Sequence, residues 1–109
     1  KNRFNMKLTQ IPEGMVIDIQ AVGTTLNVEL ERKIFSMIGR FRQYFAKINA
    51  VHFHIIQSTQ KAALPRTVNV RLGIAGEDVF ASDSGNNLMK ILGGLEQKIV
   101  QQLRKRKIG

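Results

Sequence analysis

Cysteine and tryptophan are absent from this chain of 109 residues, and it contains only two prolines. Without cysteine there is no disulfide, no thiolate metal ligand and no cysteine nucleophile, and a reducing compartment is the natural setting. No apolar run approaches the roughly 18 to 20 residues that a membrane-spanning helix needs. We therefore expect a cytoplasmic protein that has no membrane partner and is stabilised by its hydrophobic core.

Acidic residues are also scarce, since eight Asp and Glu stand against 17 Lys and Arg and give a formal net charge of +9. This excess favours a polyanionic partner. The hydrophobic share of 43% argues against disorder, and the length suits one domain. We expect that domain to span residues 15–109. Residues 1–14 are interpreted as a leader, flexible or vector-derived, because they lack an initiator Met at position 1 and a signal-peptide apolar segment.

Four segments alternate between apolar and polar residues, which is typical of half-buried strands. They are residues 15–22, 50–56, 67–74 and 79–82. Turn-forming residues at 75–78 predict a hairpin between the last two. Residues 83–86 are again turn-forming, and we expect them to end the sheet.

Two longer segments place apolar residues three or four positions apart, as amphipathic helices do. The first begins after Asn27 as N-cap, with Glu29 and Glu31 in its first turn. Its apolar stripe comprises Leu30, Ile34, Met37, Ile38, Phe41 and Phe45. The second starts at a cap, either Asn86 or Asn87, and its stripe comprises Leu88, Ile91, Leu92, Leu95, Ile99 and Leu103. Gly93 and Gly94 interrupt it, and we expect them to permit close packing against the first helix.

The resulting order is β-α-β-β-β-α, which predicts an α+β fold. The simplest arrangement has two layers, a four-stranded sheet with both helices packed on one face. The helix between the first two strands permits a parallel pair there, whereas the last three strands should form an antiparallel meander.

The cations concentrate on the two helices. Residues 104–107 are four consecutive cations, and such a run usually marks a solvated tail or a nucleic-acid patch. The candidate phosphate-binding residues are Lys33, Arg40, Arg42 and Lys47 on the first helix and Lys98, Arg104, Lys105, Arg106 and Lys107 on the second. If the helices pack side by side, their basic ends would merge into one surface. The alternative is that these cations only complement helix dipoles and maintain solubility.

Residues for catalysis or metal binding are not evident. His52 and His54 share one strand face, with Asp18 or Gln20 facing them, but zinc takes three or four ligands and there is no third histidine. The serines lack a His-Asp partner set, and the glycines form no phosphate-binding loop. We therefore expect no enzyme activity, no metal, no cofactor and no small-molecule substrate.

Five segments carry a resemblance to a known family: residues 15–19, 26–30, 40–51, 76–82 and 98–107. Together they resemble the short form of the ribosome hibernation-promoting factor family, also called ribosome-associated inhibitors. The resemblance implies a fold like that of double-stranded RNA-binding domains, and binding to the small ribosomal subunit in the mRNA and tRNA channel, where it silences translation under stress. The positions that match the family's basic residues are Arg40, Lys47, Lys98, Lys105 and Lys107.

The opening of the second helix, residues 87–93, departs from the family because it lacks two acids and a tyrosine usual there. A divergent or specialised paralogue is therefore one interpretation. A second hypothesis is a protein-interaction or self-association module that uses the open sheet face, where Ile56 and Phe80 point outward, or an edge strand. A third is generic binding of double-stranded RNA.

Overall fold

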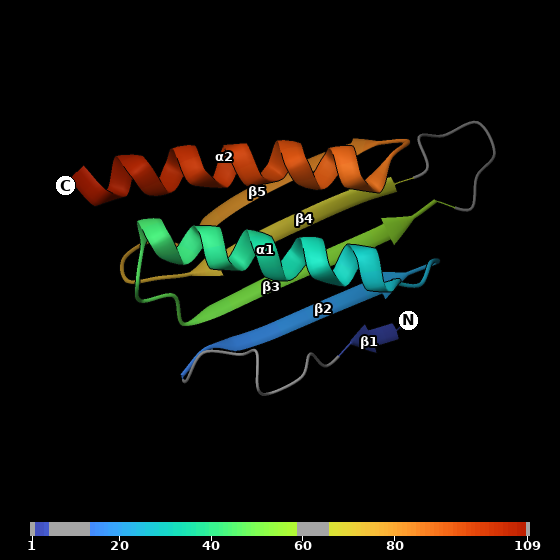
Figure 1. Cartoon of the computed structure of the whole chain (residues 1–109), viewed down its shortest axis with the longest axis horizontal. Helices are drawn as coiled ribbons and strands as arrows, with labels where there is room; N and C mark the ends of the chain where they lie inside the picture. Colours follow the sequence, from blue (N-terminus) through green and yellow to red (C-terminus); the bar gives the residue numbers. More distant parts are fainter. Residues whose placement is uncertain (1, 5–13, 59–65, 109) are drawn as a thin grey trace.

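The computed structural model describes residues 2–4, 14–58 and 66–108, which form one sheet and two helices (Figure 1). The strands are β1 (Asn2–Phe4), β2 (Val16–Val22), β3 (Ala50–Gln57), β4 (Arg66–Gly73) and β5 (Val79–Gly85), and the helices are α1 (Val28–Tyr44) and α2 (Leu88–Ile108). Both helices cover the same face of the sheet (Figure 1). The predicted two-layer α+β fold is confirmed.

The sheet has the strand order β1-β2-β3-β4-β5. β2 and β3 are parallel because α1 carries the chain back between them, and β3, β4 and β5 form the predicted antiparallel meander. The described sheet has five strands rather than the predicted four. Residues 2–4, from the segment interpreted as a leader, pair antiparallel with β2 at the edge, where Phe4 lies opposite Ile19. A strand of three residues is too short to show the alternation of apolar and polar residues by which the other strands were predicted.

β5 is longer than predicted. Residues 83–85 do not end the sheet but continue its ladder with β4, pairing Asp83 with Val68 and Ser84 with Thr67. The two hydroxyl groups of Thr67 and Ser84 also lie 3.0 Å apart. β4 begins at Arg66 and therefore offers backbone partners along the whole stretch. Such pairing outweighs the turn preference of Asp, Ser and Gly.

The helices begin where the sequence predicts. The Asn27 side chain accepts a hydrogen bond from the Leu30 N–H at 2.8 Å, and the Asn87 side chain accepts one from the Lys90 N–H at 3.2 Å, so Asn87 is the second cap. The predicted stripe of α1 is buried from Leu30 to Phe41, while Phe45 is half-buried as the C-cap. The α2 stripe is buried except for half-buried Leu88.

The predicted role of the two glycines in α2 is wrong. A Cβ on Gly93 would have no atom within 4 Å, and a Cβ on Gly94 would lie 3.4 Å from the Asp83 carboxylate of β5. Neither glycine therefore serves close packing against α1, and the helix continues through both. No helix in the described ranges is long and apolar enough to cross a membrane.

Candidate functional site

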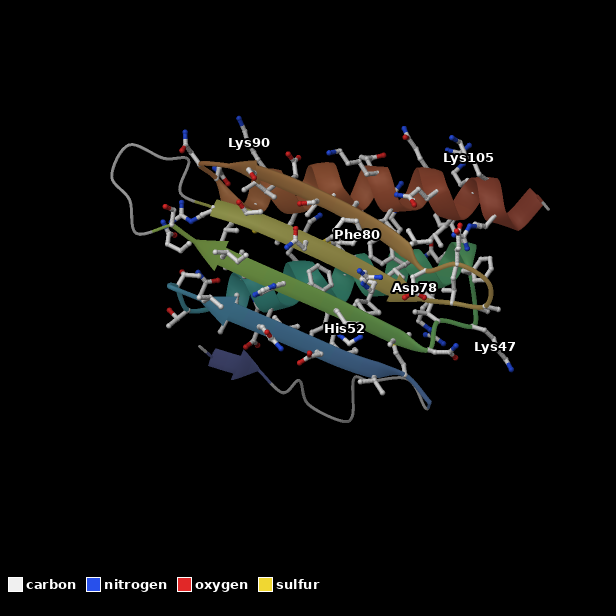
Figure 2. The ribbon with its side chains drawn as sticks, turned by 180° about the vertical axis from the view of Figure 1, so that it is seen from behind. Lys47, His52, Asp78, Phe80, Lys90 and Lys105 are labelled. Atoms are coloured by element: carbon white, nitrogen blue, oxygen red, sulfur yellow. The ribbon has the colours of Figure 1, made fainter. Side chains whose placement is uncertain are left out.

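The two helices run in the same direction, so their C-terminal ends lie at one end of the molecule (Figure 1). The strand directions require this. β2 is parallel to β3, and two antiparallel pairings make β5 parallel to β3 as well, so β2 and β5 run in the same direction. Each helix follows one of these two strands and runs back over the sheet, so the helices also share a direction. Lys47 and Lys105 accordingly lie at the same end (Figure 2). The structure thus places at one end of the molecule the two basic segments that the sequence separates (Figure 2).

Two of the candidate cations hold a buried carboxylate between the helices. Lys33 Nζ lies 2.7 Å from Glu96 Oε1, and Arg40 Nη1 lies 3.2 Å from Glu96 Oε2. The Glu96 side chain is only 9% exposed, while Lys33 and Arg40 are 25% and 37% exposed. A buried carboxylate needs such partners, because removing it from water is otherwise costly. Lys33 and Arg40 therefore join α1 to α2.

These contacts change the acidity of the groups involved. Hydrogen bonds with Tyr44 and then with Glu96 raise the pKa of the Arg40 guanidinium. Burial raises the pKa of the Glu96 carboxyl, but hydrogen bonds from Lys33 and Arg40 outweigh it, and the net pKa is below the ordinary value. Sequence reasoning missed Glu96. The signal was its place between Leu92 and Ile99, inside the apolar stripe of α2.

Lys98 and Arg106 are also engaged within the fold. Three side chains of α2, four residues apart, donate to alternate backbone carbonyls, two in β5 and one at Asp78, immediately before it. The pairs are Lys98 to Ser82 at 3.3 Å, Gln102 to Phe80 at 2.9 Å and Arg106 to Asp78 at 3.5 Å. Four helical residues rise about 6.0 Å and two strand residues about 6.6 Å, so the two series stay in register. α2 thereby covers the outer edge of β5.

Among the candidate phosphate-binding residues, the exposed cations without an ion pair in the described part are Arg42, Lys47, Arg104 and Lys105. Arg32 and Lys90 are exposed and unpaired as well, but they lie nearer the starts of α1 and α2. Lys47 does not lie on α1 as predicted, because the helix ends at Tyr44 and Phe45 caps it in an extended conformation. Arg42 and Lys47 line a hollow of about 240 Å³ beside Ile48 and Asn49. The backbone of Lys107 belongs to α2, but its side chain lies outside the described part.

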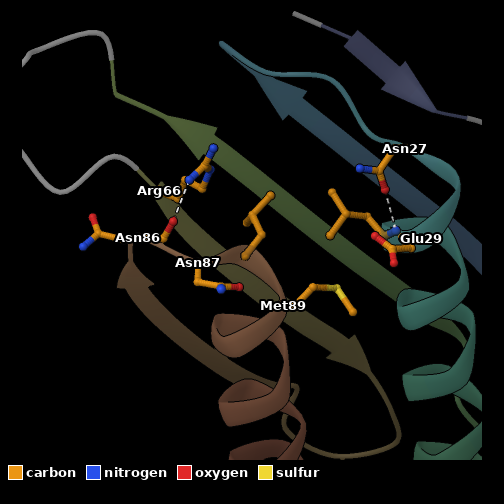
Figure 3. Close-up of a pocket in the computed structure, with 8 residues that line it drawn as sticks. Asn27, Glu29, Arg66, Asn86, Asn87 and Met89 are labelled. Carbon is orange, nitrogen blue, oxygen red and sulfur yellow. Dashed lines mark hydrogen bonds between the residues drawn. The ribbon is translucent and has the colours of Figure 1, made fainter.

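The other end of the helix layer has a different character. A hollow of about 330 Å³ lies between the starts of α1 and α2, lined by Asn27, Glu29, Arg66 and Asn87 among others (Figure 3). Arg66 donates to the Asn86 carbonyl at 2.6 Å, and Glu29 contributes a carboxylate. This end therefore offers a mixed lining rather than a basic one.

The open face of the sheet carries a third hollow, of about 220 Å³, lined by His52, His54, Asn69, Arg71 and Phe80. His52 Nδ1 lies 3.6 Å from a carboxylate oxygen of Asp18, and the strand register places Gln20 opposite His54. Among the described residues, no group of three His, Cys, Asp or Glu is placed to hold a metal ion.

Comparison with known proteins identifies similar folds. No protein-family model and no curated protein matches the sequence. A ribosomal subunit interface protein from Coxiella burnetii has a similar structure, with a TM-score of 0.75 and 19% identity over 87% of this chain and 100% of that one. The N-terminal domain of Thermus thermophilus Protein Y gives a TM-score of 0.68 and 9% identity over 84% of this chain and 98% of that one. At these identities the likeness shows a shared fold.

Proposed function

We propose that this protein binds the ribosome and inhibits translation, as a member of the hibernation-promoting factor family. The observation that carries the proposal is the match of nearly the whole fold to a ribosomal subunit interface protein. The formal net charge of +9 supports it, because ribosomal RNA presents a dense array of phosphates. The resemblance in the segments 15–19, 26–30, 40–51, 76–82 and 98–107 points the same way.

The surface proposed for the small subunit is the basic end of the helix layer. Its free cations are Arg42, Lys47, Arg104 and Lys105, joined by Lys107 on the sequence pattern. Lys33, Arg40, Lys98 and Arg106 already have partners inside the protein. We propose that these four residues stabilise the surface and add to its positive potential, and that the four free cations make the direct contacts with rRNA phosphates.

The proposed mechanism is occlusion of the mRNA and tRNA channel. Phosphate contacts position a protein on RNA without reading sequence, and the wide shallow groove of A-form RNA is recognised largely by shape. A rigid two-layer domain with a basic end meets both requirements. No chemical step is needed, so we propose a binding protein and not an enzyme.

Co-sedimentation with purified small subunits tests this proposal. We expect the wild-type protein to pellet with small subunits at low salt, and the double variant Arg104→Glu/Lys105→Glu to bind at least about tenfold more weakly, because two phosphate contacts are lost and two repulsions added. The matched control is Lys90→Glu, an exposed cation near the start of α2. Failure of the wild type to pellet, or equal loss in the control, would contradict the proposal.

The alternative of self-association through an edge strand is disfavoured at β5. The side chains of Lys98, Gln102 and Arg106 already occupy carbonyls at that edge, and an added strand would have to displace α2.

A further inference from the structure

The open face of the sheet carries polar and aromatic side chains that the proposed function does not use. The strand register aligns them in two adjacent rows. One row runs Asp18, His52, Arg71, Phe80, and the next runs Gln20, His54, Asn69, Ser82. His52 and Phe80 lie on the face turned away from the helices, toward the viewer in Figure 2. Five residues of these rows line the hollow of about 220 Å³: His52, His54, Asn69, Arg71 and Phe80.

The aromatic ring in this hollow is exposed yet held in place. Phe80 is 47% exposed, and the Arg71 guanidinium lies over its ring, 5.3 Å from the centroid. Arg71 is held from the other side by Asp78, with 3.6 Å between Nη1 and the carboxylate. An Arg stacked on an aromatic ring presents flat surfaces of low conformational freedom. Such surfaces are the ones that unpaired bases stack on.

Hydrogen-bonding groups surround the ring. His52 and His54 offer imidazole nitrogens, and the Asn69 amide is oriented by a hydrogen bond from the Ser82 hydroxyl at 2.6 Å. No carboxylate lines the hollow, and the nearest acids, Asp18 and Asp78, each contact one of its basic side chains. The lining therefore suits a ligand with a flat ring and polar edges. The volume lies below the roughly 300 to 1,000 Å³ of drug-sized sites and suits one ring system.

A protein partner fits this face less well. A stable interface covers about 800 Å² on each side and has an apolar centre. The large exposed apolar side chains of the face are Phe80 on β5 and Val16 and Val22 at opposite ends of β2, with half-buried Ile56 of β3 beside Val22. β4 lies between Ile56 and Phe80. These side chains form no contiguous apolar centre.

We propose that this hollow binds an unpaired base of single-stranded RNA, stacked on the Phe80 and Arg71 pair, with His52, His54 and Asn69 contacting the base edge and backbone. The site lies on the opposite face from the helices and goes beyond the proposed function, since it would engage a single strand independently of the basic helix ends. Those ends contact phosphates, whereas this hollow holds a base.

Titration of the protein with uridine and adenosine hexaribonucleotides, followed by amide chemical shifts, tests the proposal. Wild-type shifts should cluster on Arg71, Phe80 and the histidines of β3. Phe80→Leu keeps an apolar side chain but removes the aromatic plane, and affinity should fall about five- to 140-fold, the range for one base stacked on an aromatic ring. Thr67→Ala, on the same face outside the hollow, is the matched control and should bind like the wild type.

The outcomes separate this site from the helix surface. Arg104→Glu/Lys105→Glu should keep the hexanucleotide shifts on the sheet while losing small-subunit binding. Shifts confined to the helix ends, or unchanged affinity in Phe80→Leu, would overturn the proposal. Concentration-dependent dimerisation that is lost in Phe80→Leu, without any RNA-induced shift, would overturn it as well and assign the face to a protein contact.

Discussion

At the residue scale, Glu96 determines what two of the cations do. Its side chain is nearly buried between the helices, and both of its oxygens are bound, one by Lys33 and one by Arg40. The same two cations are thereby held against α2 while each remains partly exposed. A residue chosen from the sequence as an RNA contact is therefore first a structural partner of an acid on the other helix.

The lowered pKa of Glu96 predicts a pH dependence of stability. Because the folded-state pKa is below the unfolded value, the stabilisation is complete above about pH 4.5 and is lost as the pH falls through the folded pKa. Glu96→Gln should cost about 1–3 kcal/mol at pH 7, since it removes the negative charge and replaces one of the two acceptor oxygens by an NH2 donor, and should flatten the loss below pH 4.5. Urea unfolding from pH 7 to pH 3 measures both effects.

The control for this change is Glu77→Gln, at an exposed position in the β4-β5 turn, which should stay within about 0.5 kcal/mol of the wild type at pH 7. An unchanged acid slope in Glu96→Gln would show that other carboxylates govern the acid unfolding.

At the scale of the element, α2 has three distinct faces. Its apolar stripe packs into the core, its Lys98, Gln102 and Arg106 side chains bind β5, and its C-terminal cations Arg104 and Lys105 are exposed. The two glycines lie in its N-terminal half. A glycine inside a helix lowers stability relative to alanine, because the unfolded chain is more flexible.

Gly93→Ala is therefore expected to stabilise the protein by about 0.5–1 kcal/mol, because the added Cβ meets no atom within 4 Å. Gly94→Ala is the matched comparison, and its gain should be smaller because its Cβ would lie 3.4 Å from the Asp83 carboxylate. Urea denaturation of the two variants and the wild type gives the free energies. A loss of stability in Gly93→Ala would mean that the helix needs a local bend there.

At the scale of the whole molecule, charge is distributed unevenly along the helix layer. The end where the helices begin mixes the acidic Glu29 with the cations Arg66 and Lys90, whereas the opposite end carries the cations Arg42, Lys47, Arg104 and Lys105. Parallel helices make this possible, since both C-terminal ends, where cations are favoured by the helix dipole, lie together. An antiparallel pair would have divided the cations between two ends.

This arrangement predicts a steep salt dependence of ribosome binding. If the four free cations each neutralise one phosphate, the slope of log K against log salt should be about −3, at about 0.7 to 0.9 per contact. The variant Arg104→Glu/Lys105→Glu should reduce the steepness by about half. Sedimentation at a series of potassium chloride concentrations measures the slope, and binding that is insensitive to salt would contradict the assigned contacts.

Much of the fold follows from local patterns. The alternation in residues 50–56 predicts β3, and the spacing from Leu30 to Phe41 together with the Asn27 cap predicts α1, because burial on one side imposes these periods on the sequence. Such patterns do not predict an element that is very short, or one in which pairing with a neighbouring strand outweighs the conformational preference of its residues. β1 has three residues, and residues 83–85 join a strand only because β4 supplies the pairing.

The candidate site was likewise predictable from the sequence only in part. The sequence by itself determined the excess of cations, their concentration on and near two helices and the run at 104–107. Only the tertiary structure decided which cations remain free, because the partners of Lys33, Arg40 and Lys98 lie 63, 56 and 16 residues away along the chain. Periodicity reports which side of an element is buried. It carries no information on which distant carboxylate or carbonyl the fold will place against an exposed side chain.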